Sequence, residues 1–483
     1  MSGISREQFS KSVKWKIVNL IVTKGLNFLI SVIIARLIAP DNYGYMVIWS
    51  ILLTFGDVLV VNGTDTVLIQ KQIEKKEDWN TGFSLCFARA ILLTCVFWII
   101  APSVASFYDV LELEILIRIA SLEFLMQPFV VIGTAKCAKK MNYKVVFISD
   151  LLSTCLGGVI SLFLIVLNKE VYVLVFYTVA KQLFYAIMLT WLMKNSIRFA
   201  IDKYSAKIIF FDGFKAMGNG FLDISSSFFC SLFMGKTWLP AELGYNSKAQ
   251  NLAQILGVES YNVISQILLP TFSSYQDDKE RLKKITRILV ELTIYIMFPV
   301  MFGTAVCGEQ IICLLFTEKW MPAVPFLQIA CIYYAFNPIR QLCMYVNYSI
   351  KKYKCNNLIE CCRLLMTLTV MILFIVSKKH NLIMYVLSGS IISIIVSVIY
   401  MISICIELKY TVREVIIDIF PSVVLTIVSL IPCVLIGVYI KSSIIGILVS
   451  VVVAVTIYIL MSRLFKIKIF LYLKNILYER YNL

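Results

Sequence analysis

The chain has 483 residues, 60% of them hydrophobic and 15% charged, and a formal net charge of +16. Soluble domains contain about 45–50% apolar and about 25% charged residues, so this composition excludes an ordinary soluble protein. It also excludes a soluble catalytic domain on a membrane anchor, because apolar stretches continue from Trp15 to Leu464 without a long polar interruption.

About fourteen stretches of about twenty predominantly apolar residues follow one another along the chain, and each predicts a membrane-spanning helix. The first is too long for a signal-peptide core and ends in Ala39-Pro40 rather than at a small-residue cleavage site, so we expect it to remain. The fold class is therefore predicted to be an all-α integral membrane protein. The predicted spans are 16–37, 43–61, 81–101, 115–135, 143–167, 171–193, 208–235, 243–269, 285–306, 324–348, 358–376, 382–406, 415–440 and 443–464.

The positive charges are distributed unevenly over the loops. When successive loops are assigned to opposite sides, about 30 of the 45 Lys and Arg residues fall on one side, about 7 on the other and about 8 within spans. The positive-inside rule places the richer side, and with it both termini, in the cytoplasm. The net charge therefore indicates topology, with nucleic-acid binding as the weaker alternative. Residues 466–481 mix apolar and basic side chains and predict an interfacial helix at the inner leaflet.

The usual enzyme and metal-site patterns are absent from the sequence. Most of the 14 cysteines fall inside apolar runs without a CxxC pair, as expected for small buried side chains. His380 is the single histidine, which excludes zinc sites rich in histidine and Ser-His or Cys-His nucleophile pairs. Gly213 and Gly218 have the spacing of a phosphate loop, but Asn219-Gly220 replaces the Lys-Ser/Thr pair that would bind phosphate. We expect no enzyme activity, no cofactor and no metal.

Two segments of the chain that lie two hundred residues apart resemble each other. The run from Arg36 to Tyr45 aligns with the run from Lys236 to Tyr245, with a cation, a proline and a Gly-Tyr pair at matching positions. In each, the proline would stop one helix and an acidic or amide side chain could cap the next. Chance or a common turn is the alternative. A true repeat predicts two parallel six-helix lobes around a central cavity, residues 1–200 and 201–408, followed by two extra helices and a basic tail in residues 409–483.

Polar and charged side chains within the spans are the candidate functional groups, because a charge inside a membrane costs several kcal/mol unless it meets a partner or water. Lys24 and Asn27 share a face of the first predicted helix, and Tyr177 and Tyr185 flank Lys181 on a face of the sixth. The alternative is an interhelical hydrogen bond or a snorkelling side chain. The bases outnumber the acids, which favours an anionic substrate such as a phosphate or an acidic sugar. The predicted substrate-binding residues are Lys24, Asn27, Arg89, Tyr177, Lys181, Tyr185, Asp223, Lys248 and Arg340.

Several motifs spread over nearly the whole chain also match a known pattern. They are Ala35-Arg36-Leu37 with the run from Pro40 to Gly44, Leu222-Asp223, Gly235-Lys236, and the runs 242–245, 269–278 and 316–328. With these motifs the chain resembles the polysaccharide-transporter family, the flippases for O-antigen and colanic-acid units within the multidrug/oligosaccharidyl-lipid/polysaccharide exporter superfamily. The resemblance implies two six-helix lobes, two trailing helices and alternating access. It also implies export of a polyprenyl-diphosphate-linked oligosaccharide across the bacterial cytoplasmic membrane, for capsule, exopolysaccharide or O-antigen, and no catalytic residue.

Three alternatives stay open at this point. A peptidoglycan-precursor flippase of the same superfamily would differ in which deletion strain it rescues. A membrane enzyme such as a polymerase would need an outside loop longer than the short ones predicted here, and a cation-coupled drug exporter often carries an acid in an early helix, which the first predicted helix lacks. The expected partners are the lipid-linked oligosaccharide, the bilayer, a polysaccharide polymerase and a chain-length regulator, without nucleic acid.

Overall fold

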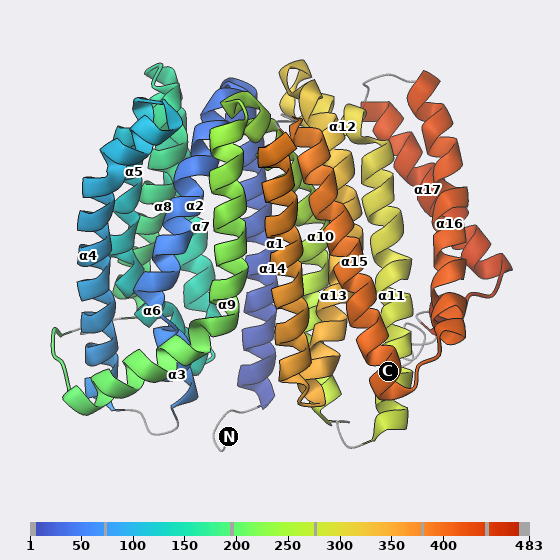
Figure 1. Cartoon of the computed structure of the whole chain (residues 1–483), viewed down its shortest axis with the longest axis horizontal. Helices are drawn as coiled ribbons and strands as arrows, with labels where there is room; N and C mark the ends of the chain where they lie inside the picture. Colours follow the sequence, from blue (N-terminus) through green and yellow to red (C-terminus); the bar gives the residue numbers. More distant parts are fainter. Residues whose placement is uncertain are drawn as a thin grey trace. The chain divides into compact units, whose positions relative to one another are not determined.

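The computed structural model describes residues 6–71, 75–193, 198–274, 278–377, 381–439 and 444–472. In these ranges the chain is helical and contains no strand (Figure 1). The helices are α1 (Arg6–Leu37), α2 (Pro40–Val61), α3 (Thr64–Gln70), α4 (Lys76–Tyr108), α5 (Glu112–Ser121), α6 (Glu123–Lys139), α7 (Tyr143–Val166), α8 (Glu170–Leu192), α9 (Lys203–Thr237), α10 (Pro240–Ser274), α11 (Lys279–Val306), α12 (Gly308–Phe316), the 3-10 helix η1 (Glu318–Ala323), α13 (Val324–Ser349), α14 (Tyr353–Ser377), α15 (Leu382–Leu408), α16 (Val412–Tyr439) and α17 (Ile444–Leu464).

The membrane-protein class predicted from composition is confirmed by helix length and hydropathy. Within the described ranges, 11 helical segments are long and apolar enough to cross a membrane. Two of these segments join neighbouring helices, α2 with α3 and α5 with α6. The long helices α9, α10 and α13 overlap predicted spans but are not among the 11. The number fourteen therefore stays a prediction.

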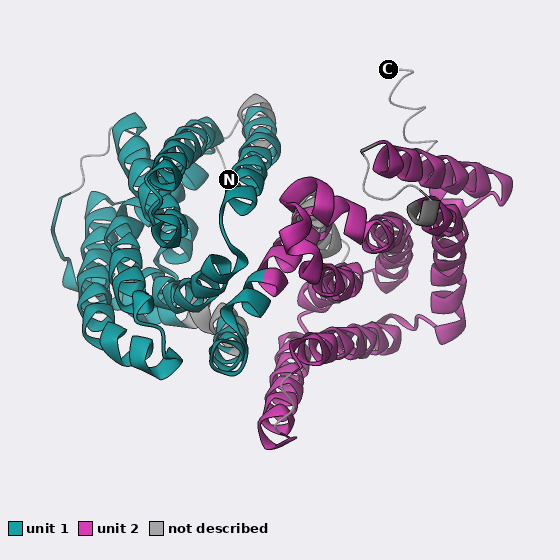
Figure 2. Ribbon diagram, turned by 90° about the horizontal axis from the view of Figure 1, so that it is seen from above, with its two compact units in different colours: residues 1–244 teal, residues 245–483 magenta. Residues whose placement is uncertain are grey.

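The chain divides into two compact units, residues 1–244 and 245–483 (Figure 2). The first unit extends beyond the lobe boundary predicted at residue 200, because α9 packs against α2, α3 and α4. The lobe boundaries derived from the repeat remain a prediction. Within the predicted interfacial helix at 466–481, residues 468–472 are helical, and residues 473–481 lie outside the described ranges.

The two turns of the sequence repeat have matching local structure. α1 and α9 each end three residues before the proline that begins the next helix, Pro40 in α2 and Pro240 in α10. Proline is favoured there because its fixed φ suits a helix and its missing N–H would be unpaired in any case. One turn further on, Gly44 lies against the backbone of Pro240 and Gly244 lies against the backbone of Pro40. The two turns thus pack reciprocally within the first unit.

Filling either glycine should loosen this reciprocal contact. A Cβ on Gly44 would overlap backbone atoms of Pro240, which cannot swing away as a side chain can. We expect Gly44→Ala and Gly244→Ala each to lower the free energy of unfolding by about 1–3 kcal/mol, measured by thermal unfolding in detergent. Gly25→Ala in α1 is the matched control, since no atom lies within 4 Å of its new Cβ. Alanine is favoured over glycine in helices by about 1 kcal/mol, so equal midpoints for Gly44→Ala and Gly25→Ala would contradict the packing.

α9 bends along its length, so that its first turns run sideways while the rest lies along the neighbouring helices (Figure 1). Asp202 caps its start by accepting a hydrogen bond from the Ser205 N–H at 2.8 Å, which lowers the pKa of the Asp202 carboxyl. Gly213 lies against the Asn62 carbonyl, an approach that a side chain would block. The bend and the close approach bring α9 onto the end of α2.

The two trailing helices are attached to α11 by a network of charges. The Arg287 guanidinium on α11 contacts Asp418 at 2.8 and 2.9 Å and Glu414 at 2.8 Å, both on α16. The hydroxyl of the buried Tyr410 donates to Asp418 at 2.7 Å. On α17, the Tyr458 hydroxyl donates to the Tyr295 carbonyl of α11 at 2.8 Å. Polar contacts therefore hold α16 and α17 against α11.

Candidate functional site

A polar cluster joins three helices of the first unit, and we call Asn27, Asp150, Tyr177 and Lys181 the first polar cluster. The Asn27 Oδ1 atom on α1 accepts hydrogen bonds from the Tyr177 hydroxyl at 2.7 Å and from the Lys181 ammonium at 3.0 Å, both on α8. Lys181 also forms an ion pair with Asp150 of α7 at 3.5 Å. The structure thus brings together three of the residues predicted to bind substrate.

Small residues on α7 allow the three helices to approach at this point. A Cβ on Gly157 would lie 3.2 Å from the Lys181 Cβ, and a Cβ on Gly158 would lie 2.9 Å from the Ile30 Cδ1 on α1. Glycine at such positions lets membrane helices pack closely enough for their polar side chains to meet. The Gly157-Gly158 pair therefore positions α8 on one side of α7 and α1 on the other.

The Lys181 side chain is held loosely and is partly exposed. Its distance of 3.5 Å from Asp150 exceeds the 2.7–2.9 Å of a close charge-assisted hydrogen bond. The side chains of Lys181 and Asp150 are 27% and 25% exposed. Lys24, exposed on α1, and Glu123 of α6 also act electrostatically on Lys181. The first polar cluster therefore offers an accessible cation to an anionic ligand.

A second polar cluster lies in the second unit and consists of Arg340, Glu360, Arg363 and Tyr400. Arg340 of α13 donates to Glu360 of α14 at 2.6 Å, and Arg363 donates to the other oxygen of that carboxylate at 2.7 Å. The Tyr400 hydroxyl of α15 donates to Glu360 at 3.0 Å. The side chains of Arg340, Glu360 and Arg363 are 15%, 21% and 20% exposed. Two guanidinium groups, which match phosphate with paired donors, thus converge on one carboxylate.

Two predicted residues take part in other contacts. Arg89 joins α4 to α3 through a hydrogen bond to the Thr64 hydroxyl at 2.9 Å and also bonds the Leu85 carbonyl of its own helix. Lys248 of α10 is 3% exposed, and its ammonium lies 5.2 Å from the centre of the Phe316 ring. The structure assigns neither to a polar cluster, and their binding role stays a prediction.

Three predicted residues remain, of which Tyr185 and Lys24 lie close to the first polar cluster. Tyr185 follows Lys181 by one helical turn, and Asp150 acts on it electrostatically. Lys24 precedes Asn27 by three residues on α1. Asp223 belongs to α9, but its side chain lies outside the described residues.

The sequence prediction omitted four members of the two clusters: Asp150, Glu360, Arg363 and Tyr400. Glu360 and Arg363 are three residues apart on one helix face, and this spacing predicts their ion pair. It does not predict the ion pair of Glu360 with Arg340, which lies on α13. Asp150 and Lys181 are on different helices, so their spacing in the sequence carries no signal. Asp150 and Glu360 could have been identified by their position within predicted spans, because a carboxylate is rare and costly there.

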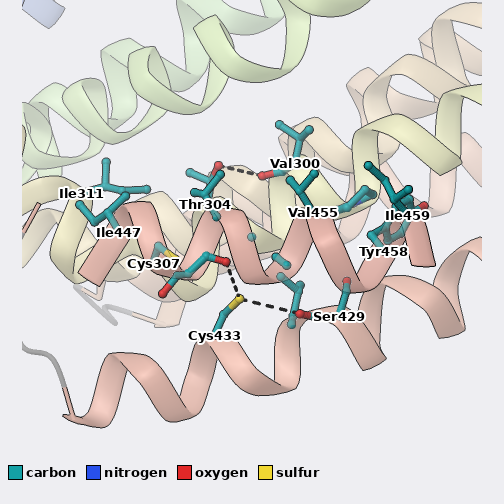
Figure 3. Close-up of a pocket in the computed structure, with 16 residues that line it drawn as sticks. Val300, Thr304, Cys307, Ile311, Ser429, Cys433, Ile447, Val455, Tyr458 and Ile459 are labelled. Carbon is teal, nitrogen blue, oxygen red and sulfur yellow. Dashed lines mark hydrogen bonds between the residues drawn. The ribbon is translucent and has the colours of Figure 1, made fainter. Parts of the chain in front are cut away.

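A separate cavity of about 330 Å³ lies between α11, α12, α16 and α17 (Figure 3). Its lining is mainly apolar, with Ile311, Ile447 and Val455 among the side chains, and includes no charged residue. The Cys433 thiol on its wall donates to the Ser450 carbonyl at 3.2 Å. Such a cavity suits hydrocarbon and does not select an anionic group.

The described residues thus form an all-helical fold with polar clusters on its long helices, and among them no group of three or more His, Cys, Asp and Glu side chains could hold a metal ion. Solved structures share the fold. The structure titled "Lipid II flippase MurJ, inward closed conformation" has a TM-score of 0.72 and 13% identity, covering 93% of this chain and 98% of that one. An inward-facing multidrug resistance MATE family transporter of the MOP superfamily has a TM-score of 0.62 and 10% identity, covering 82% and 98%.

Residues 33–325 match the model of the family described as "Polysaccharide biosynthesis protein", and the chain belongs to this family. The chain is 24% identical to a membrane protein in the cps region of Klebsiella pneumoniae, over 69% of this chain and 70% of that one. It is 23% identical to the succinoglycan biosynthesis transport protein ExoT of Rhizobium meliloti (strain 1021), over 67% and 66%. It is 22% identical to the lipopolysaccharide biosynthesis protein WzxC of Escherichia coli (strain K12), over 68% and 67%. The family predicted from the motifs is confirmed.

Proposed function

We propose that this protein is a flippase that moves a polyprenyl-diphosphate-linked oligosaccharide across the bacterial cytoplasmic membrane for capsule, exopolysaccharide or O-antigen synthesis. The observation that carries the proposal is the pair of polar clusters with partly exposed cations, Lys181 in one and Arg340 with Arg363 in the other. Membership of a polysaccharide biosynthesis family supports it, as do relatives named for succinoglycan transport and lipopolysaccharide synthesis. The neighbouring solved structures are a flippase and a transporter, which supports transport rather than catalysis.

The chemistry of the two clusters fits the cargo. A diphosphate or an acidic sugar presents paired anionic oxygens, which guanidinium and ammonium groups bind. Tyr177 and Tyr185 flank Lys181 and can stack on sugar rings, while the prenyl tail remains in lipid. Lys24, Lys248, Arg89 and Asp223 complete the proposed binding residues.

The proposed layout follows from the sequence repeat. Two six-helix lobes, residues 1–200 and 201–408, would surround a central cavity and alternate its access, and residues 409–483 would form two additional helices and a tail. All of the fourteen predicted spans, including α9, α10 and α13, would then cross the membrane. The bias of Lys and Arg supports cytoplasmic termini. A polysaccharide polymerase and a chain-length regulator are the proposed protein partners.

Deleting the gene tests the function directly. We expect the deletion strain to lose its surface polysaccharide and to accumulate the lipid-linked repeat unit on the cytoplasmic side, because synthesis continues while transport stops. Surface polysaccharide is measured by immunoblot, and the intermediate by mass spectrometry of extracted lipids. A plasmid copy of the gene should restore both. Normal surface polysaccharide in the deletion strain would reject the proposal.

A peptidoglycan-precursor flippase is the second candidate, favoured by the fold likeness to MurJ. It is distinguished by complementation, because a strain depleted of its own lipid II flippase would then grow when this gene is expressed. We expect no rescue, since the family match and the curated relatives support polysaccharide export.

A further inference from the structure

One helix of each unit begins in the same way. Met141 before α7 and Lys351 before α14 both have left-handed φ, of 53° and 61°. In both turns the following backbone N–H donates to a carbonyl five residues earlier, at 2.8 Å. A tyrosine then begins each helix, Tyr143 in α7 and Tyr353 in α14. The two helices are therefore in register with each other at an offset of 210 residues.

In this register, Asp150 and Glu360 occupy equivalent positions. Each follows the first tyrosine of its helix by seven residues, two helical turns, so the two carboxylates extend from the same face of equivalent helices. Each also pairs with a cation from another helix, Asp150 with Lys181 and Glu360 with Arg340. The two cations come from different elements, Lys181 from α8 and Arg340 from α13. The position of the acid is therefore equivalent in the two units, whereas the position of its cation is not.

The carboxylates compete for the groups that would bind the cargo. An anionic phosphate and a carboxylate use the same N–H donors, so one must leave when the other binds. Within a membrane, a cation without a partner is costly, and the acid at this position balances the charge of Lys181 in the first cluster and one of the two guanidinium charges in the second. The partial exposure of both pairs leaves room for exchange.

We propose that Asp150 and Glu360 are internal counter-ions, which the anionic groups of the cargo displace on binding and which promote its release by rebinding the cations. The inference rests on the proposed function, because it assumes an anionic cargo. Both are positioning residues: they set how tightly Lys181 and Arg340 hold an anion, without touching the cargo themselves.

Binding of farnesyl diphosphate, a short soluble prenyl diphosphate, to the purified full-length protein tests the proposal. We expect Asp150→Asn and Glu360→Gln to bind this probe on the order of tenfold more tightly by calorimetry, because competition is removed, while export in cells falls because release slows. The charge-keeping variants Asp150→Glu and Glu360→Asp should bind as the unchanged protein does. Glu114→Gln is the matched control and should bind as the unchanged protein does, since Glu114 pairs with Arg118 of its own helix α5 and belongs to neither polar cluster.

A second measurement needs no variant and covers the case in which one does not fold. In the unchanged protein, carbodiimide labelling of Asp150 and Glu360, read by mass spectrometry, should rise when the probe is added. Unaltered labelling with bound probe, or equal or weaker binding by folded Asp150→Asn and Glu360→Gln, would overturn the counter-ion role. Failure of the unchanged protein to bind the probe at all would instead count against the proposed function.

Discussion

Replacing Lys24 and Lys181 together by alanine should abolish polysaccharide export while leaving the protein folded. Lys181 donates a hydrogen bond to Asn27 at 3.0 Å and Lys24 acts on it electrostatically, so this change removes the cation of the first polar cluster and its neighbouring cation. Loss of one charged partner from a desolvated, hydrogen-bonded contact costs about 2–5 kcal/mol, or at least about thirtyfold in affinity. Surface polysaccharide in the deletion strain carrying the variant is the measurement, with membrane abundance and thermal unfolding in detergent recorded alongside.

The controls separate lost binding from lost folding. Removing Lys181 leaves Asp150 without its cation, so the paired variant Lys181→Gln with Asp150→Asn removes both charges and keeps hydrogen-bonding groups. We expect it to be as stable as the unchanged protein and still defective in export. Arg118→Gln, which removes an ion pair with Glu114 of the same helix and touches neither polar cluster, should export normally. Unchanged export by the Lys24→Ala, Lys181→Ala variant would reject the assignment of these cations.

The second large effect concerns stability. Arg287→Met should destabilise the attachment of the two trailing helices by about 3–5 kcal/mol, because it leaves Asp418 buried without its cation. The Asp418 side chain is 5% exposed, so water cannot replace the lost contacts. We expect a lower midpoint of thermal unfolding in detergent, and new protease cleavage between α15 and α16. Both are measured on the purified protein.

An exposed ion pair supplies the comparison for Arg287. Arg281 is 69% exposed and pairs with Asp278 three residues away, so Arg281→Met should change stability by at most about 1 kcal/mol. The double variant of Arg287→Met with Asp418→Asn should recover part of the loss, because the buried carboxylate is then neutral while Glu414 keeps its ion pair with Lys283. Equal midpoints for Arg281→Met and Arg287→Met would show that the network does not hold α16.

Helix boundaries were largely predictable, because apolar runs and prolines act locally. The predicted start at 143 and the predicted ends at 37, 306 and 464 coincide with the ends of α7, α1, α11 and α17. The span predicted at 115–135 is instead divided between α5 and α6 at Leu122. Such a break depends on packing with neighbouring helices, and composition does not record it.

The candidate site was predicted in part. Lys181, Tyr177 and Asn27 were found because helical periodicity places polar residues on one face, and an intramembrane charge is rare enough to be noticed. Their carboxylate partner was not, since Asp150 lies on another helix. Arg340 showed the same limit: its partner Glu360 is twenty residues further along the chain and comes from α14.

The excess of apolar residues determined by itself that this chain belongs in a membrane. The unequal distribution of Lys and Arg over the loops predicts cytoplasmic termini, and this orientation stays a prediction. The motifs of the chain also identified the family, because they depend on local sequence. Only the tertiary structure decided which of the rare intramembrane charges meet. An ion pair between helices depends on where Gly157 and the other small residues let the helices approach, and that distance is a property of packing rather than of spacing along the chain.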